Sequence, residues 1–163
     1  MEIKDNYLDQ ESFEKIEGIL TGFNFAWFFN NNIDFEGEVD KFQFTHVFYQ
    51  NSQATSDNIE ILIPIIELIQ PLVLGKIKAN LLTRTSNIIK NQFHIDLGDL
   101  SNSPEKLKQW TTSIFYVNNN NGYTEFEDGT KVESVANRMI TFPSNIKHRG
   151  TSCSDEQRRI VIN

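Results

Sequence analysis

The sequence is poor in cysteine, in basic residues and in long apolar runs. Its 163 residues include a single cysteine, Cys153, which excludes an intrachain disulfide and suits a reducing compartment. The 22 acidic residues outnumber 15 basic ones, and this net charge of −7 argues against a nucleic-acid partner, because such proteins present a basic face to phosphates. The longest apolar stretch, 61–74, contains Pro64, Glu67 and Pro71 and is too short to cross a bilayer, and the first residues lack the apolar core of a secretion signal. We therefore expect a cytoplasmic protein with no membrane and no nucleic-acid partner.

The first half of the chain carries two helix signals. Apolar residues at helical spacing predict a short amphipathic helix over 9–20, and Gly22 is a plausible stop for it. Asp57 is a good N-cap for a second helix over 58–69, which Pro64 should kink or split. Strands are predicted between the two helices, over 27–29 and 42–49.

The second half changes to short β-type runs separated by turn residues. Asp128-Gly129 is a strong hairpin signal, and 119–122 and 143–145 also have the composition of turns. Several short strands at close spacing indicate a sandwich or barrel. The predicted strands cover 74–82, 91–96, 111–118, 123–126, 131–135, 138–142, 147–150 and 158–162.

This succession of elements predicts a mainly β fold with N-terminal helices and a double-stranded β-helix (jelly-roll) core. The length fits a single domain, 1–163, with one buried core. We expect about 1–72 to form a helical and mixed support, and about 74–163 to form the jelly-roll core that carries the site.

Three side chains have the composition of a metal site. Side chains at positions i and i+2 of a strand share one face, so His94 and Asp96 can point to the same place. His148, which follows a predicted turn, would complete a set of two imidazoles and one carboxylate. Such a set, with open positions left over, is the usual holder of non-haem Fe(II), although it could also hold zinc.

Two adjacent arginines, Arg158 and Arg159, open the last predicted strand. An arginine suits the binding of a dicarboxylate beside the metal, because its planar fork makes two parallel hydrogen bonds to a carboxylate. Two neighbouring residues of a strand point to opposite faces, so only one of the pair can serve.

The combination of motifs resembles the iron- and 2-oxoglutarate-dependent dioxygenases, specifically the prolyl-4-hydroxylase-like branch and its small phage and bacterial forms. The resemblance is good in the second half of the chain and loose in the first. The matching segments are 94–96, 112–118, 122–126, 140–144 with His148, and 159–163.

The resemblance implies a role for each matching residue. His94, Asp96 and His148 would bind Fe(II), and Arg159 would pair with the far carboxylate of 2-oxoglutarate. The family's inward pattern of a base, a small residue and a small polar residue favours Arg159 over Arg158, with Arg158 kept as the alternative.

Two further residues complete the predicted cosubstrate pocket. Tyr116 would donate its hydroxyl to the same carboxylate of 2-oxoglutarate. Asn80 falls near a position where relatives often have a pocket-lining tyrosine, and its strand contains no tyrosine here.

The implied reaction is hydroxylation of an unactivated C–H, with a peptidyl proline as one candidate, and release of succinate and CO2. The implied partners are 2-oxoglutarate, O2 and a peptide or small-molecule substrate. Two alternatives stay open, namely a cupin-like metal enzyme without 2-oxoglutarate and a non-catalytic jelly-roll binding module. Metal-dependent binding of 2-oxoglutarate and release of succinate distinguish the three.

Phenylalanine is abundant, with 13 residues, and most of it should form a packed core. His46, in an aromatic-rich run, is expected to be packed rather than to bind metal. Five phenylalanines could instead line a substrate cleft, and the sequence leaves both readings open: Phe28, Phe29, Phe42, Phe44 and Phe48.

Overall fold

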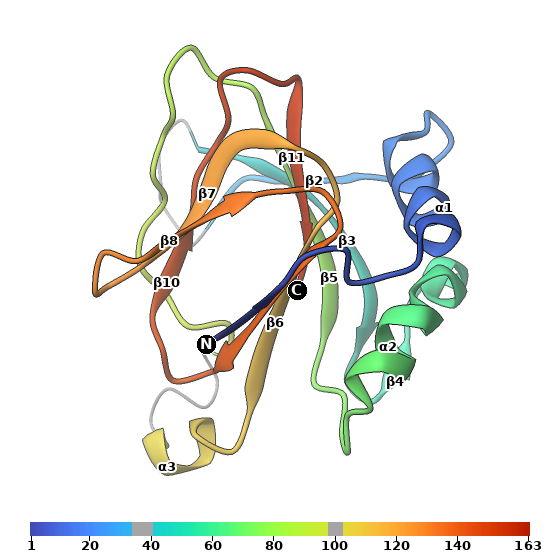
Figure 1. The fold of residues 1–163 in the computed structure, drawn as a ribbon, viewed down its shortest axis with the longest axis vertical. Coiled ribbons are helices and arrows are strands. Elements are labelled where there is room, and N and C mark those ends of the chain that lie inside the picture. Colours follow the sequence, from blue (N-terminus) through green and yellow to red (C-terminus); the bar gives the residue numbers. More distant parts are fainter. Residues whose placement is uncertain (34–40, 98–102) are drawn as a thin grey trace.

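The computed structural model describes residues 1–33, 41–97 and 103–163. Within these ranges the strands form an eight-stranded and a three-stranded antiparallel sheet that enclose the interior of a roll (Figure 1). The strands are β1 (Glu2–Lys4), β2 (Phe28–Asn30), β3 (Gln43–Gln50), β4 (Gln53–Ala54), β5 (Ile77–Thr83), β6 (Thr111–Tyr116), β7 (Asn120–Phe126), β8 (Lys131–Ser134), β9 (Arg138–Pro143), β10 (His148–Gly150) and β11 (Arg158–Ile162).

The larger sheet has the order β1-β9-β6-β11-β5-β3-β2, with β4 paired to β3, and the smaller sheet has the order β10-β7-β8. Strands distant in sequence are therefore neighbours, as when β11 lies between β5 and β6. The predicted mainly β fold with N-terminal helices and a jelly-roll core is confirmed. The first half of the chain contributes β1 to β4 to the larger sheet as well as three helices that end by Ile69.

The helices are α1 (Gln10–Thr21), the 3₁₀ helix η1 (Asp57–Leu62), α2 (Ile63–Ile69) and the short α3 (Pro104–Leu107). The carboxylate of Asp9 caps α1 by accepting from the Ser12 amide at 2.9 Å, and Gly22 ends it. Pro64 lies in the first turn of α2, so it splits the second predicted helix into η1 and α2. The cap of η1 is Ser56, one residue before the predicted Asp57.

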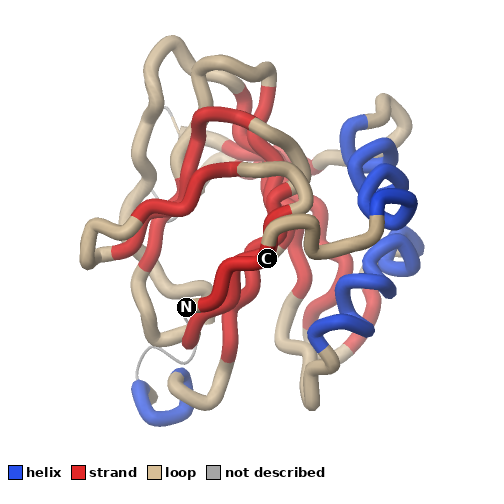
Figure 2. Tube along the Cα trace, viewed as in Figure 1, coloured by secondary structure: helices blue, strands red, loops and turns tan. Residues whose placement is uncertain are grey.

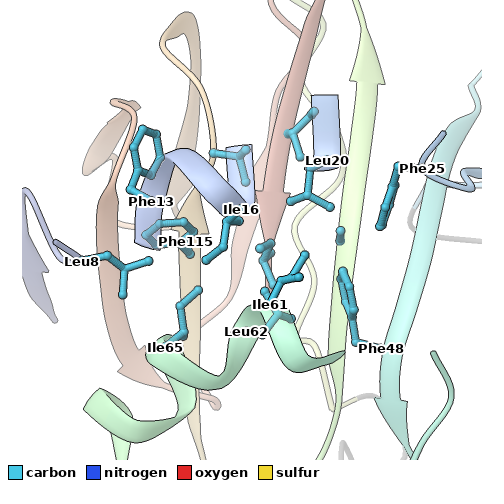
Figure 3. Close-up of a cluster of buried hydrophobic side chains, with 14 of the residues drawn as sticks. Leu8, Phe13, Ile16, Leu20, Phe25, Phe48, Ile61, Leu62, Ile65 and Phe115 are labelled. Atoms are coloured by element: carbon cyan, nitrogen blue, oxygen red, sulfur yellow. The ribbon is translucent and has the colours of Figure 1, made fainter. Parts of the chain in front are cut away.

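The helices α1 and α2 cover the outer face of the larger sheet (Figure 2). Their apolar sides pack on that face in the main core cluster, in which Ile16 and Leu20 of α1 are fully buried (Figure 3). None of the helices in the described ranges has the length and apolar character that crossing a bilayer requires.

Side-chain alternation along β11 separates the two faces of the larger sheet. Ile160 and Ile162 belong to the cluster under the helices, whereas Val161 belongs to a second cluster inside the roll with Tyr116. Since alternate residues of a strand share a face, Arg159 and Asn163 point to the interior with Val161. The interior of the roll therefore contains polar side chains beside its apolar cluster.

Several elements differ from the sequence-based expectation. The segment 91–96 is not a strand, because within it only His94 makes a ladder pairing, an isolated bridge to His148. The expected turn over 119–122 is also displaced, since β7 begins at Asn120. Neither β1 nor α3 was predicted, because both are too short to show periodicity.

Candidate metal centre

His94 and His148 are held opposite each other by their own backbones. The amide of His94 donates to the carbonyl of His148 at 2.9 Å, and the reverse bond is 3.0 Å long. This reciprocal pair fixes the two Cα atoms across an antiparallel bridge. The two imidazole rings lie with their centroids 4.8 Å apart. One bridge, rather than the predicted strand, thus brings the two histidines together.

The ring orientation of both histidines is set by backbone carbonyls. Nδ1 of His94 lies 3.2 Å from the carbonyl oxygen of Gln92, and Nδ1 of His148 lies 3.4 Å from that of Ile146. A carbonyl oxygen only accepts hydrogen bonds, so Nδ1 is the protonated nitrogen in each neutral ring. The lone pair of each ring is then on Nε2, which is the arrangement that metal-binding histidines adopt.

Asp96 lies between the two Nε2 atoms. Its Oδ1 is 3.7 Å from Nε2 of His94, and its Oδ2 is 3.5 Å from Nε2 of His148. One ligand atom from each of the three residues lies within 4.8 Å of the others. His148 is buried, whereas the other two side chains are 26% and 22% exposed, so the group opens on one side.

The electrostatics of the group fit a divalent metal. Burial acts to raise the pKa of the Asp96 carboxyl, but in the metal-free protein a hydrogen bond from His94 and the charge of His148, which both require protonated imidazoles, outweigh it and lower the pKa. Oδ2 of Asp96 is buried and has no hydrogen-bond partner within the described ranges. A buried carboxylate oxygen without a donor is costly unless a cation binds it. The three residues are therefore positioned for metal binding.

The segment that carries His94 is attached to the smaller sheet by a cluster of charges. The buried carboxylate of Glu125 on β7 accepts from Arg149 at 2.7 Å and from Lys90 at 3.2 Å. The guanidinium of Arg149 also stacks 4.1 Å from the centre of the Phe93 ring. These contacts tie the segment 90–94 to β7 and β10.

Replacing Glu125 with Gln is expected to destabilise the metal-free protein by about 1–2 kcal/mol at neutral pH, because two charge-assisted hydrogen bonds are weakened. Burial raises the pKa of Glu125, but the bonds from Arg149 and Lys90 outweigh it and lower the pKa in the folded state. This stabilisation is present above the unfolded-state pKa of about 4.3 and is lost as the pH falls through the folded-state value.

Urea unfolding of both proteins at several pH values measures the effect. The two stabilities should differ at pH 7 and converge in acid. A constant difference at every pH would show that the charge of Glu125 is not its source.

Arg159 is buried inside the roll and is surrounded by side-chain hydroxyl groups. Its Nε donates to Ser134 at 2.8 Å, and a terminal nitrogen donates to Thr124 at 3.2 Å. Thr124 also accepts from the Tyr116 hydroxyl at 2.8 Å, and the Tyr116 ring lies 5.7 Å from the guanidinium carbon. Burial lowers the pKa of Arg159 and raises that of Tyr116.

No carboxylate in the described part of the chain makes an ion pair with Arg159. A buried guanidinium without an anion is costly, and pairing normally relieves that cost. The environment of Arg159 therefore fits an anionic ligand.

The spacing between this guanidinium and the group of His94, Asp96 and His148 can be estimated along β10. Thr124 pairs with Gly150, and a terminal nitrogen of Arg159 lies 3.4 Å from where a Cβ atom on Gly150 would be. Gly150 is two residues beyond His148, which corresponds to about 7 Å along a strand. A short diacid can span that distance.

Gly122 leaves the space that the stem of Arg159 occupies. A Cβ atom at position 122 would lie 2.6 Å from Cδ of Arg159 and 2.8 Å from the carbonyl oxygen of Ser152. Gly122→Ala should therefore displace Arg159 and cost about 1–3 kcal/mol of stability through overpacking. We expect weaker binding of an anionic ligand as well, measurable by calorimetry beside a thermal unfolding scan. Unchanged stability and binding would mean that the site tolerates the added methyl group.

The other predicted residues lie as follows. Arg158 points away from the interior and donates to the carbonyl of Thr21 at the end of α1 at 3.1 Å. Asn80 lies on β5 and donates to Asn163, which in turn donates to Asp96. Asn80 thus lies behind the carboxylate and makes no side-chain hydrogen bond to Arg159 or Tyr116.

Sequence reasoning missed some of the residues around the site. Thr124 lay within a matching motif without a role, and only strand phase marked Asn163 as inward. Ser134, at the end of β8, gave no signal because a serine at a strand end is common. The contacts that single these residues out cross between strands distant in sequence.

The aromatic residues divide between core and surface. His46 is buried and packed, as expected, with Nδ1 2.7 Å from the carbonyl of Ala26 and Nε2 2.7 Å from the Ser56 hydroxyl. Phe48 is fully buried and Phe44 packs against the same cluster. The remaining three candidates for a cleft lining are largely exposed, at 62%, 61% and 43%: Phe28, Phe29 and Phe42.

Comparison with known proteins finds likeness in structure rather than in sequence. No protein-family model and no curated protein sequence matches the chain. A viral collagen prolyl hydroxylase from Paramecium Bursaria Chlorella virus-1 superposes with a TM-score of 0.54 at 15% identity, covering 99% of this chain and 86% of that one.

Two bacterial structures agree with it. A 2OG-Fe(II) oxygenase family protein from Burkholderia pseudomallei superposes with a TM-score of 0.62 at 6% identity, covering 97% of this chain and 79% of that one. A prolyl-4-hydroxylase from Pseudomonas putida gives 0.52 at 12% identity, covering 99% and 88%. The chain therefore has the fold of the 2-oxoglutarate- and Fe(II)-dependent oxygenases, prolyl hydroxylases among them.

Proposed function

We propose that this protein is an Fe(II)- and 2-oxoglutarate-dependent oxygenase that hydroxylates an unactivated C–H. The observation that carries the proposal is the buried guanidinium of Arg159, without a carboxylate partner in the described part of the chain, about 7 Å along β10 from the His94, Asp96 and His148 group. A metal site alone would fit many enzymes. A metal site with a buried cation beside it fits one whose cosubstrate is a chelating diacid.

The metal would be held by Nε2 of His94, Nε2 of His148 and a carboxylate oxygen of Asp96. Iron(II) bound there, with 2-oxoglutarate and O2, supplies the oxidising power for hydroxylation, and succinate and CO2 are released. The protein contributes the placement of the reactants and a dry surrounding. Apolar side chains of the inner cluster, among them Phe126 and Phe142, line the interior next to His148 and exclude water there.

The diacid would be oriented by the groups around Arg159. The guanidinium would pair with the far carboxylate, while Ser134 and Thr124 hold the stem and fork in place. The Tyr116 hydroxyl, which now donates to Thr124, could turn its hydrogen to the same carboxylate by rotation about its C–O bond. Arg158 takes no part in this scheme, because it binds the end of α1.

A peptidyl proline is the substrate that we propose within this class. Its support is that two of the similar structures are called prolyl hydroxylases, one of them a collagen prolyl hydroxylase. We also propose a cytoplasmic location, for which the support is the single, buried and unpaired Cys153.

Succinate release tests the proposal. The metal-free protein is supplied with Fe(II), 2-oxoglutarate and O2, with and without proline-containing peptides, and succinate is measured by mass spectrometry. We expect succinate only when Fe(II) and 2-oxoglutarate are both present, with more of it and a hydroxylated peptide when a substrate is included. Turnover that needs the metal but no 2-oxoglutarate would instead favour a cupin-like enzyme. A protein that binds neither the metal nor 2-oxoglutarate and produces no succinate would instead be a non-catalytic module.

A further inference from the structure

Two asparagines lie in line behind Asp96. Nδ2 of Asn163 donates to Oδ1 of Asp96 at 3.1 Å, and Nδ2 of Asn80 donates in turn to Oδ1 of Asn163. The two residues come from the adjacent strands β5 and β11, whose ends are joined by reciprocal backbone hydrogen bonds between Lys78 and Asn163. Asp96 is thus connected to the rigid larger sheet through two amide side chains.

The carboxylate dictates how both amides are oriented. An ionised carboxylate only accepts hydrogen bonds, so the group of Asn163 that faces Asp96 must be its NH2. Oδ1 of Asn163 then faces Asn80, whose NH2 group must donate to it. The acceptor-only carboxylate of Asp96 therefore determines which end of the Asn163 amide faces it, and Asn163 in turn determines the orientation of the Asn80 amide.

The amide contact makes the two oxygens of Asp96 unequal. Oδ1 accepts from Asn163, whereas Oδ2 lies 3.5 Å from Nε2 of His148 and has no hydrogen-bond partner among the described residues. The oxygen left over is the one that faces the second histidine. Asn163 thereby turns the carboxylate so that one oxygen is held by protein and the other is available to a metal.

Packing does not explain the choice of asparagine at position 80. Oδ1 of Asn80 is buried and unpaired within the described ranges, as is Oδ2 of Asp96. A leucine of similar size would fill the same space without burying an unsatisfied acceptor. The amide is accounted for by its other end, which fixes Asn163.

We propose that Asn163 is a positioning residue for the metal ligand Asp96, and that Asn80 holds Asn163 in the required orientation. This inference rests on the proposed function in that it takes Asp96 to be a metal ligand. Partners of this kind, which orient a ligand without touching the metal, typically change metal affinity ten- to a hundredfold when removed.

Titration of the metal-free protein with Co(II) under anaerobic conditions tests this, with the visible absorbance of the bound ion as the readout and no turnover required. Asn163→Leu is expected to weaken Co(II) binding roughly ten- to a hundredfold. Asn80→Leu should weaken it by a smaller factor, because Asn163 keeps its donor and loses only its anchor. The thermal unfolding midpoint of metal-free Asn80→Leu should change little, because the variant removes the unsatisfied oxygen of Asn80 and leaves Oδ1 of Asn163 without its donor.

Asn118→Ala is the matched control. Asn118 also supports β11, by accepting from the Ile160 amide and donating to the Arg158 carbonyl, both at 2.9 Å, but it makes no contact with Asp96. It should lower the unfolding midpoint and leave Co(II) affinity unchanged. The inference is overturned if Asn163→Leu binds Co(II) as the wild type does, or if both leucine variants lose stability without losing affinity. A wild-type protein that binds no Co(II) would overturn the proposed function itself.

Discussion

Asp96→Ala is expected to abolish binding of divalent metal and, with it, all turnover of 2-oxoglutarate. The substitution removes the only carboxylate among the three residues proposed to bind metal and leaves two imidazoles. We expect a loss of more than about a hundredfold in metal affinity, since changes outside the ligand set already cost ten- to a hundredfold. Calorimetric titration of the metal-free protein with Co(II) or Fe(II) measures it.

The stability of the metal-free Asp96→Ala variant distinguishes a lost ligand from a lost fold. While the two imidazoles are neutral, Asp96 carries one hydrogen bond from Asn163 and an unpaired buried oxygen, so its removal should change the stability of the metal-free protein little under those conditions. Asp128→Ala is a suitable control, because Asp128 accepts a bond from the Thr130 amide in the exposed β7–β8 turn, away from the group. Metal affinity that survives in Asp96→Ala would remove this carboxylate from the site.

Arg159→Met should separate 2-oxoglutarate binding from both metal binding and stability. Methionine keeps an unbranched apolar stem and removes the charge. Losing the buried partner of a ligand carboxylate costs about 2–5 kcal/mol. We therefore expect 2-oxoglutarate affinity to fall at least about thirtyfold, with metal affinity retained.

The same substitution should leave the metal-free protein as stable as before or make it more stable, because a buried charge without an anion is replaced by an apolar group. Binding of 2-oxoglutarate to the metal-loaded protein under anaerobic conditions and a thermal scan of the metal-free form provide the two measurements.

Arg158→Met is the matched control, one residue away on the opposite face of β11. Its guanidinium binds the Thr21 carbonyl at the end of α1, so this variant should bind 2-oxoglutarate normally and lose a little stability. If Arg158→Met were defective and Arg159→Met normal, Arg158 rather than Arg159 would bind the cosubstrate, and the pocket proposed here would be wrong.

Local signals carried much of the fold. The boundaries of β11, the start and stop of α1 and the Asp128-Gly129 turn all follow from residue types within a few positions of one another. Gly129 has a φ of +87°, a conformation that glycine adopts without strain, so its place in the turn could be predicted directly.

The local rules failed where a distant partner decides the structure. The segment 91–96 has strand-like residues, yet it forms no continuous ladder with β10. Its backbone meets β10 at the His94 bridge and in a hydrogen bond from the Asn91 amide to the Gly150 carbonyl, and Arg149 stacks on Phe93. Asn120 has the composition of a turn residue but begins β7, where it pairs with Ser134 of β8. Neither result can be predicted from the neighbouring residues.

The site itself shows the same division. Residue type predicted that His94, Asp96 and His148 lie together, as they do, although a bridge rather than the predicted strand joins the histidines. Strand phase predicted that one of the two arginines, Arg159, points to the interior. The supporting contacts of Ser134 with Arg159, and of Asn163 with Asp96, join strands that only the register of the two sheets brings together. Residues that support a site in this way depend on the three-dimensional structure and have no characteristic spacing in the sequence.

The most direct test of the central claim is a crystal structure obtained without oxygen, with Fe(II) and 2-oxoglutarate. We expect a single metal ion bound by His94, Asp96 and His148, and one diacid with its far carboxylate on Arg159. A metal ion bound elsewhere, or a diacid held with Arg159 still unpaired, would contradict it.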